Sequence, residues 1–388
     1  MADKRVYVDV SPVMLRWARE RARLSIDDLQ RAFPKLEAWE QGDARPTLKQ
    51  LERYARKTHT PFGFFFLEQP PEEKLPIPDF RTMPATQSRR PSPDLLETIY
   101  LCQQRQEWYR EYALTLGEAP LSFVGSATLQ DDVVTVAATM RKQVGFDIKA
   151  RSRMRTWEEA RRRFVESVEG VGVLVMVSGI VKGNTHRKLD PEEFRGFALV
   201  DDLAPLIFIN AADTKAAQMF TLAHELAHIW LGKTGVSNAS LQEVGDTQRI
   251  EQWCNQVAAE MLVPMSHLRQ VYRAQQSLDA AMQHLARYFK VSTLVILRRL
   301  YDAGEISQKT YWEKFAAELE RVRNIDRPVE KGGGDFYRTL KTRVGRRFAE
   351  AVVASALEGR LLYRDAYQML GIRKSGVFER LTHELGVI

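Results

Sequence analysis

The N-terminal part of the chain has apolar residues at helical spacing. From Met14 to Leu67, apolar positions recur every three or four residues within three segments separated by short polar turns. This period places the apolar side chains on one face of each helix and predicts a small helical bundle. The next stretch, QPPEEKLPIPDFRTMPATQSRRPSPD, is rich in prolines and polar residues, which exclude a continuous helix and favour an extended connection. We therefore place a domain boundary in this stretch.

Strand patterns occur only in the centre of the chain. Three short runs of β-branched and aromatic residues lie at 172–181, 194–200 and 205–210. The last two are joined by the residues DDLA, as in a β-hairpin. Helices are predicted before these runs, at residues 94–116, 129–144 and 156–168. The pattern predicts an α+β protein that is mostly helical, with a small central β-sheet.

The helix that follows the hairpin is apolar on most of its faces. It is predicted to run from Lys215 to Leu231, with Asp213 as its N-cap and Gly232 at its C-terminal end. A helix of this composition is buried. Any polar side chain inside it needs a specific stabilising interaction, because burial of an unpaired polar group is costly.

Three such side chains occur in the motif His224-Glu225-Leu226-Ala227-His228. Histidines four residues apart lie on one helix face, so both imidazoles can reach one metal ion while the intervening glutamate projects beside it. The alternative is two core histidines and a buried glutamate that hydrogen bonds satisfy, which would place three costly groups in one apolar helix. The motif favours a catalytic site with one Zn²⁺ per chain, in which Glu225 is the general base.

A catalytic zinc site takes three protein ligands and leaves one position for water, so a third ligand is expected downstream. The segment RIEQWCNQVAAEMLVP is predicted to be a helix that Pro264 terminates. Glu251 and Asn255 lie one turn apart on it, which allows the carboxylate to bind zinc while the amide orients a ligand histidine. Glu260 is an alternative ligand, but it lies nearly opposite Glu251 on the helix. We therefore favour Glu251.

Other reactive residues lack such a setting. The two cysteines, Cys102 and Cys254, are far apart and have no paired spacing typical of a disulfide framework or a thiolate zinc site. Cys254 could be a fourth, inhibitory ligand, although a small buried residue is the simpler interpretation. His267 follows the metal-site helices closely and could stabilise the oxyanion of a transition state.

The hairpin at residues 194–210 directly precedes the histidine-bearing helix. If one of its strands is a sheet edge beside the cleft, an extended peptide can pair with it. Such pairing would give main-chain affinity for a substrate without much sequence preference.

The charge of the chain adds a candidate partner. Its 388 residues carry a formal net charge of +7, which suits contact with nucleic acid, although a solvated basic surface gives the same value. No run of about 18 uncharged apolar residues appears, and the first ten residues lack the apolar core of a signal peptide. We therefore expect a cytoplasmic protein with no membrane contact.

The central motifs resemble those of a known family. The stretch EFRGFALVDDLAPLIFINAADTKAAQMFTLAHELAHIWLG, followed by IEQWCNQVAAEMLVP, is similar to the ImmA/IrrE family of bacterial metallopeptidases, and the similarity runs from Leu129 to Tyr301. The resemblance implies a site-specific endopeptidase that cuts a helix-turn-helix repressor and so switches on prophage, mobile-element or DNA-damage genes. It also implies that Glu225 is catalytic and that the zinc ligands are His224, His228 and Glu251. A predicted helix-turn-helix unit at residues 285–300 matches the family's layout.

The N-terminal segment resembles an XRE-type helix-turn-helix domain through LEAWEQGDARPTLKQLERYA and PFGFFFLEQPP. Between Ser25 and Glu40 it is about four residues shorter than that pattern, which removes most of the turn and the start of the recognition helix. The remaining basic surface can contact phosphates but carries little base information. The alternative is that the domain docks against the peptidase or a partner protein. The candidate nucleic-acid contacts are Arg16, Arg19, Arg23, Lys35, Arg45 and Lys49.

These patterns divide the chain into six parts. They are an XRE-like domain (1–70), a proline-rich linker (71–93), a helical connector (94–127), a zincin-like metallopeptidase domain (128–265), a helix-turn-helix-like subdomain (266–325) and a C-terminal helical domain (326–388). In the expected fold, the small sheet packs on the histidine-bearing helix and helical domains flank it.

The function expected from these features is zinc-dependent cleavage of a helix-turn-helix repressor, which controls gene expression. The alternative is a DNA-binding regulator or antitoxin-like protein whose metal site is sensory. The presence of Glu225 argues against the alternative, because retention of a metal needs only the ligands. The candidate partners are a protein substrate, DNA and a second copy of the chain.

Overall fold

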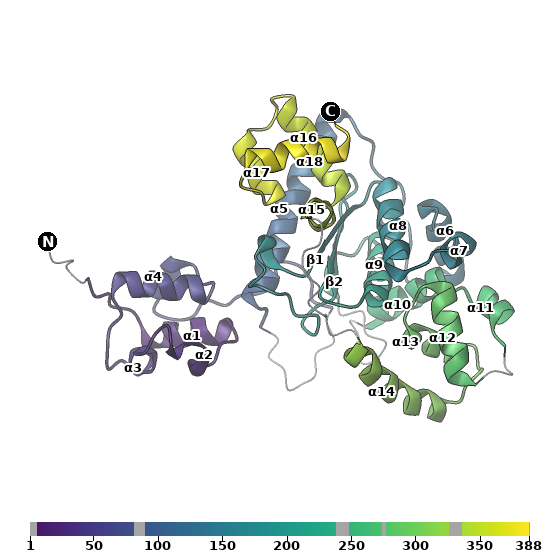
Figure 1. The fold of residues 1–388 in the computed structure, drawn as a ribbon, viewed down its shortest axis with the longest axis horizontal. Helices are drawn as coiled ribbons and strands as arrows, with labels where there is room; N and C mark the ends of the chain where they lie inside the picture. The colour runs from purple at the N-terminus through teal and green to yellow at the C-terminus, as the bar shows by residue number, and fades with distance from the viewer. Residues whose placement is uncertain (1–5, 81–89, 238–247, 274–276, 326–335, 388) are drawn as a thin grey trace. The chain divides into compact units, whose positions relative to one another are not determined.

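The computed structural model describes residues 6–80, 90–237, 248–273, 277–325 and 336–387. The chain divides into two compact units, one from Met1–Pro76 with Met83–Tyr100 and one from Ile77–Thr82 with Leu101–Ile388. Helices dominate the described ranges and four strands form one mixed sheet (Figure 1), which confirms the predicted α+β class. Among the described helices, none is both long and apolar enough to cross a membrane.

The N-terminal unit contains a bundle of short helices. They are α1 (Pro12–Arg21), α2 (Ile26–Gln30), α3 (Leu36–Gln41), α4 (Leu48–Lys57) and the 3-10 helix η1 (Phe62–Phe66). Ser25 and Thr47 begin α2 and α4 with reciprocal capping boxes. The rings of Trp39 and Tyr54 pack edge to face in the core, with centroids 6.4 Å apart. The helices α2 and α3, in the segment where the sequence predicts a shortened helix-turn-helix, have only five and six residues.

A four-stranded sheet forms the centre of the second unit, in the order β1-β3-β2-β4. Its strands are β1 (Leu174–Ser178), β2 (Gly196–Leu199), β3 (Leu206–Asn210) and β4 (Gly235–Ser237). β2 and β3 form the predicted antiparallel hairpin, β1 runs parallel to β3, and β4 runs antiparallel to β2. All residues of the four strands are buried, which explains their continuous apolar runs.

The edges of this sheet differ from those expected from the sequence. β2 lies between β3 and β4, and β3 lies between β1 and β2. Neither strand of the hairpin therefore offers an open edge, and the hypothesis that a substrate pairs with the hairpin was wrong. The strand that follows the histidine-bearing helix, β4, is a sheet edge. Its three residues were too few to carry a period that could be recognised in the sequence.

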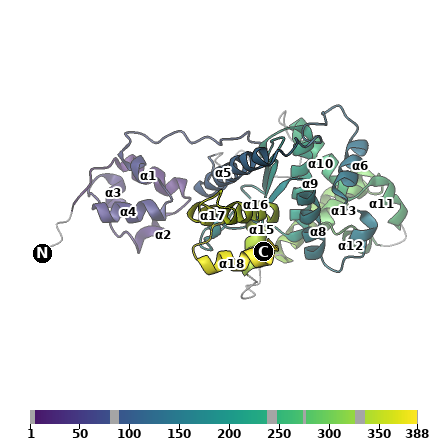
Figure 2. The ribbon, with the colours of Figure 1, turned by 90° about the horizontal axis from the view of Figure 1, so that it is seen from above.

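Helices cover both sides of the sheet. Figures 1 and 2 show α8 (Trp157–Gly170) and α9 (Lys215–Leu231) on one side, and α5 (Pro93–Leu116), α15 (Phe336–Val344) and α16 (Arg346–Leu357) on the other. The remaining helices are α6 (Val133–Val144), α7 (Ile148–Ser152), η2 (Val181–Gly183), α10 (Gln248–Leu262), α11 (Met265–Val271), α12 (Leu278–Phe289), α13 (Thr293–Asp302), α14 (Gln308–Ile325), α17 (Tyr363–Leu370) and α18 (Ser375–Leu385).

Most predicted helices have the expected bounds. α9 spans the predicted residues and ends at Gly232, whose φ of 68° lies in the left-handed region. Its N-cap is Thr214, whose hydroxyl accepts from the Ala217 N–H, whereas the Asp213 carboxylate accepts from the Thr214 N–H. The assignment of Asp213 as N-cap was therefore wrong by one residue. In the segment predicted to be a helix-turn-helix unit, the helices α12 and α13 follow each other with a short connection, and Ser292 caps the second helix; the assignment as a helix-turn-helix unit stays a prediction.

The linker predicted at residues 71–93 is free of helix from its start to Phe80 and again from residue 90 to the start of α5, whereas residues 81–89 lie outside the described part. One stretch of it is more than a surface connection. Asp79 forms a parallel β-bridge with Val236 of β4, and Ile77 is buried. The linker thus contributes a segment to the second unit.

The C-terminal helices are fixed to the sheet through the turn at Gly345. Its φ is 81°, and a Cβ atom on it would lie 2.8 Å from the carbonyl oxygen of Val175 in β1. Arg105 of α5 donates from Nε and Nη2 to the Met369 carbonyl at 3.1 and 2.8 Å. These contacts hold the C-terminal helices against β1 and α5.

We predict that Gly345→Ala lowers the free energy of unfolding by about 1–3 kcal/mol, because the new Cβ combines a strained φ with a clash against backbone. Gly359→Ala is the matched control, since Gly359 also has a positive φ of 73° but has nothing within 4 Å of its would-be Cβ. Denaturant unfolding of both variants checks the difference. Equal losses would show that the close approach to β1 is unimportant.

Candidate metal centre

The centre is built on α9, which lies inside the second unit. Every residue from Gln218 to Leu231 is buried, so the helix meets protein on all sides. His224, Glu225 and His228 have no exposed surface. Their polar atoms must therefore find partners on neighbouring elements.

α10 packs against α9 and supplies the third side chain, Glu251. Its Oε1 lies 3.0 Å from His228 Nε2, its Oε2 lies 3.2 Å from His224 Nε2, and the two Nε2 atoms are 3.1 Å apart. Nitrogen and oxygen ligands at about 2.0–2.1 Å from a tetrahedral zinc lie about 3.3–3.5 Å from each other. The three side chains therefore fit a single zinc ion and could hold it with one position left open.

Asn255 lies one turn after Glu251 on α10. Its Oδ1 is 3.0 Å from His224 Nδ1 and, because this oxygen can only accept, Nδ1 must be the donor. This hydrogen bond fixes the tautomer of His224 and leaves the lone pair of Nε2 directed at the metal position. The structure thus brings Asn255 to the place that the sequence predicted.

Glu225 lies beside the three candidate ligands but is held differently. Its Oε1 accepts a short hydrogen bond from the Ser237 hydroxyl of β4. Its Oε2 is buried and has no hydrogen-bond partner among the described residues. Gly196 leaves the room for this carboxyl, since a Cβ there would lie 2.9 Å from Oε1. One carboxyl oxygen is therefore positioned and the other is available for a proton.

The two carboxyl groups have opposite pKa shifts. Burial raises the pKa of Glu225 to about 8, against the opposing effects of His224 and the Ser237 hydrogen bond. Burial acts in the same direction on Glu251, but the charge and hydrogen bonds of His224 and His228 outweigh it and lower its pKa to about 2. Adjacent carboxyls with separated pKa values are typical of a pair with different tasks. Glu251 is suited to remain an anionic ligand, and Glu225 to exchange a proton near neutral pH.

Three residues considered in the sequence lie elsewhere. The Glu260 carboxylate pairs closely with Arg299, and its Oε1 accepts from the Met265 N–H at 3.2 Å. Cys254 is buried on α10 and is not part of the candidate metal-binding group among the described residues. His267 Nε2 hydrogen-bonds the Tyr288 hydroxyl at 2.9 Å. His267 therefore has a hydrogen-bond partner on α12, and its role in transition-state stabilisation stays a prediction.

Two functional contacts were missed in the sequence. Ser237 belongs to the unpredicted strand β4. Phe80 comes from the linker and stacks on His228, with ring centroids 5.6 Å apart and planes at 10°. The linker sequence indicated only an extended backbone, and no local pattern could show that this backbone forms a β-bridge with β4.

The basic residues of the N-terminal unit are not equally available. Arg19 is 13% exposed, and its Nε and Nη2 donate to the Glu40 carboxylate at 2.7 and 2.8 Å. Arg19 is therefore held in an ion pair within the unit, and its role as a phosphate contact stays a prediction. Arg16 donates to the Glu40 carbonyl at 3.2 Å but remains about half exposed. The other candidates, which are exposed, are Arg23, Lys35, Arg45 and Lys49.

Comparison with protein families supports a metallopeptidase-like function. Residues 168–301 match the model of a peptidase family described as IrrE N-terminal-like domain. Residues 344–384 match a domain of unknown function, and no curated protein matches the chain significantly. The first matched range contains the whole metal-binding group and Glu225. The central part of the chain is thus similar to peptidases of the ImmA/IrrE type.

Proposed function

We propose that the protein is a zinc-dependent endopeptidase with zinc held by His224, His228 and Glu251. The observation that carries this proposal is the convergence of the three ligand side chains, whose nearest nitrogen and oxygen atoms lie 3.0–3.2 Å apart in each pair, beside a buried carboxyl. That carboxyl, Glu225, has a pKa near 8 and one unpaired oxygen. The match to a peptidase family supports the same assignment.

The residues around the candidate metal site have separate roles in the proposed reaction. Zinc bound in this group would lower the pKa of a water molecule and polarise the scissile carbonyl. Glu225 accepts the proton of the attacking water at its free oxygen and returns it to the leaving amine. Ser237 holds the other oxygen of Glu225, and Asn255 holds the ring of His224, so both groups are oriented before a substrate arrives.

As the substrate we propose a cytoplasmic helix-turn-helix repressor, whose cleavage would change the expression of stress, prophage or mobile-element genes. The resemblance of the central motifs to ImmA/IrrE peptidases supports this choice. The second candidate function is a DNA-binding or antitoxin-like regulator with a sensory metal site. One oxygen of Glu225 is hydrogen-bonded to Ser237 and the other has no partner among the described residues. This arrangement favours the enzyme, because a sensory site needs metal ligands but does not need a buried proton acceptor beside them.

We predict that His224→Ala, His228→Ala and Glu251→Ala each lose bound zinc, because each removes a ligand. Glu225→Gln should keep zinc and lower kcat/KM by at least about 100-fold, because it removes only the base. Metal analysis of the purified variants and peptide-hydrolysis assays check this. Glu260→Gln is the control on the same helix and should keep its zinc. Loss of zinc in that variant, with retention in Glu251→Ala, would contradict the ligand assignment.

The substrate proposal is tested by incubating the zinc-loaded protein with a helix-turn-helix repressor encoded beside its gene. We expect one specific cleavage, which mass spectrometry locates and which chelation or Glu225→Gln abolishes. Reproducible absence of cleavage by a protein that holds its zinc would instead favour the sensory regulator.

We propose that the N-terminal unit docks against the peptidase or recognises a partner protein, in preference to binding a specific operator sequence. Any DNA binding should therefore weaken steeply with salt and differ little between sequences, because phosphate contacts dominate it. Titration of the Glu225→Gln protein against its own promoter and scrambled DNA, at two salt concentrations, checks this. A promoter preference that persists at the higher salt would show that the short helices α2 and α3 still read bases.

A further inference from the structure

The edge strand β4 is covered by a segment of the linker, Ile77–Phe80. The Phe80 N–H donates to the Val236 carbonyl at 2.9 Å, and the Val236 N–H donates to the Pro78 carbonyl at 3.0 Å. Asp79, between these two linker residues, is the parallel bridge partner of Val236. On its other side β4 pairs with β2. The segment therefore occupies the outer edge of the sheet, as an added strand would.

This pairing is short for a reason that lies in the sequence of the segment. In a parallel ladder, the next hydrogen bond would run from the N–H of residue 78 to the Thr234 carbonyl. Pro78 has no N–H and cannot make that bond. A backbone hydrogen bond contributes about 0.5–1.5 kcal/mol net, so the two bonds to Val236 hold the segment only weakly. The segment can therefore leave the edge without disrupting the sheet.

The side chain of Phe80 reaches the candidate metal centre. Its ring stacks on the candidate ligand His228, with centroids 5.6 Å apart and planes at 10°. A Cβ on Gly235 would overlap this ring, so the glycine makes the space that the ring fills. The edge of β4 therefore accepts an extended backbone together with a flat apolar side chain beside His228.

The same strand also orients the proposed base. The Ser237 hydroxyl donates to Glu225 Oε1, and Ser237 directly follows Val236 in β4. The backbone groups that bind the linker and the hydroxyl that holds the base thus belong to adjacent residues. An extended peptide that paired with the outer edge of β4 would need the N–H and carbonyl groups of Val236 that the linker already uses.

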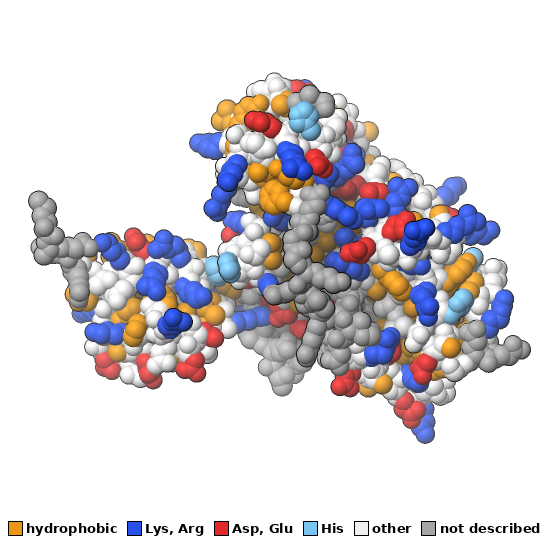
Figure 3. Space-filling model, in the orientation of Figure 1, with side chains coloured by type: hydrophobic (Ala, Val, Ile, Leu, Met, Phe, Trp, Pro, Cys, Tyr) orange, Lys and Arg blue, Asp and Glu red, His pale blue; other side chains and the backbone are white. Residues whose placement is uncertain are grey.

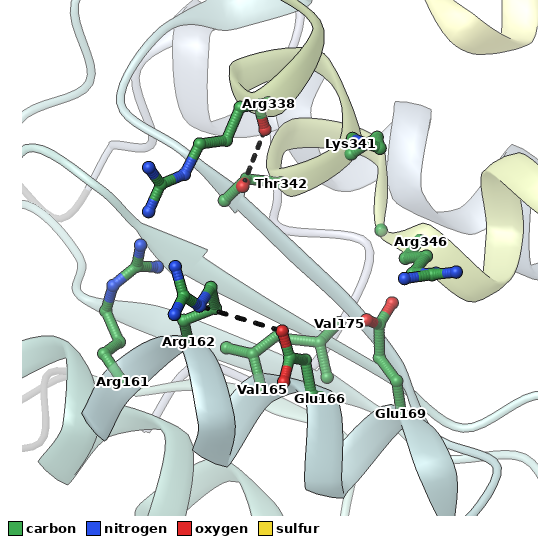
Figure 4. A pocket seen from close by; sticks show the side chains of 11 residues that line it. Arg161, Arg162, Val165, Glu166, Glu169, Val175, Arg338, Lys341, Thr342 and Arg346 are labelled. Carbon is green, nitrogen blue, oxygen red and sulfur yellow. Dashed lines mark hydrogen bonds and ion pairs between the residues drawn. The ribbon is translucent and has the colours of Figure 1, made fainter. Parts of the chain in front are cut away.

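The other edge of the sheet, β1, has a cover of a different kind. Val175 of β1 lines a cavity of about 190 Å³ between α8 and the α15–α16 turn, which Figure 4 shows from close by. Basic side chains around this cavity have acidic partners, since Lys341 pairs with Glu384 at 2.8 Å and Arg346 pairs with Glu350 at 2.7 Å. Figure 3 shows basic and acidic side chains interspersed over this part of the surface. Packed helices with paired charges therefore close the β1 edge, whereas a short linker segment covers β4.

We infer that Ile77–Phe80 competes with peptide substrates for the edge of β4 and leaves it before cleavage. This inference rests on the proposed peptidase function. The peptide that fits is an extended segment that pairs with Val236 and places an aromatic side chain in the space between Gly235 and His228. A peptide with an N–H at the position of Pro78 would add the hydrogen bond that the linker lacks.

The binding test uses the fluorescent peptide KLPIPDF, which copies residues 74–80, and the zinc-loaded full chain. Phe80→Ala removes the stacked ring from the linker, so this variant should bind the peptide at least about tenfold more tightly than the unchanged protein does. Phe80→Pro should bind it more tightly still, because proline also removes the donor to Val236. Fluorescence anisotropy and zinc content are both measured, so the result does not depend on cleavage.

Two matched controls accompany this test. Phe66→Ala, at an exposed phenylalanine of the N-terminal unit, should leave the affinity unchanged. The peptide KLPIPDA, which lacks the aromatic ring, should bind to Phe80→Ala at least about tenfold more weakly than KLPIPDF does. Equal affinities for the two peptides would show that the space between Gly235 and His228 does not select an aromatic side chain.

A reversible lock tests whether the segment must leave. Asp79 and Val236 are bridge partners, and neighbouring strands lie about 4.8 Å apart, within the Cα separation that a disulfide spans. Oxidation of Asp79→Cys/Val236→Cys should lower peptide binding and cleavage of a protein substrate at least about tenfold. Reduction with a phosphine, which avoids the zinc-binding thiolate of other reductants, should restore both. The two single variants are the controls and should not respond to the oxidant.

Unchanged or weaker peptide binding in a Phe80→Ala protein that keeps its zinc would overturn the inference. Equal binding by the oxidised and reduced double variant would overturn it as well. Loss of zinc in Phe80→Ala would show that the ring supports His228, and the locked variant then decides alone. If peptide binding responds as expected but no protein substrate is cleaved, the competition stands and the peptidase proposal fails.

Discussion

The structure depends on the burial of three polar side chains in one apolar helix. His224, Glu225 and His228 have no exposed surface, and each would cost several kcal/mol if it were left unpaired. Their partners come from different elements, with Glu251 and Asn255 on α10 and Ser237 on β4. Hydrogen bonds and close polar contacts to these groups therefore join α10 and β4 to α9, so the candidate metal centre is built from the same elements that form the core of this unit.

Prediction from the sequence succeeded where the interactions are local. The spacing of the two histidines and the angle between Glu251 and Glu260 follow from 3.6 residues per turn, and the structure places these side chains accordingly. The N-cap was misplaced by one residue because Asp213 and Thr214 can both cap a helix. Only the hydrogen bonds distinguish them, because the Ala217 N–H donates to the Thr214 hydroxyl whereas the Asp213 carboxylate accepts from the Thr214 N–H.

Contacts between segments that are far apart in the chain could not be predicted from the sequence. The order β1-β3-β2-β4 places the hairpin inside the sheet, and nothing in the hairpin's residues indicates that two further strands flank it. The contact of Phe80 with His228 is of the same kind, since a proline-rich stretch predicts extended backbone but not its partner. Ser237 could not be linked to Glu225 because a three-residue strand has no detectable period.

The two edges of the sheet are covered in different ways, which bears on where a substrate can enter. At β1, the Gly345 turn lies against the backbone of Val175 and is backed by packed helices. At β4, the described cover is a four-residue segment with two backbone hydrogen bonds and one stacked ring. Because an element with few buried contacts opens at a lower free energy than a packed one, the β4 edge is the one that can be exposed without disturbing the core. The edge that opens more easily is also the edge beside Glu225, so release of the linker and access to the proposed catalytic base are a single step.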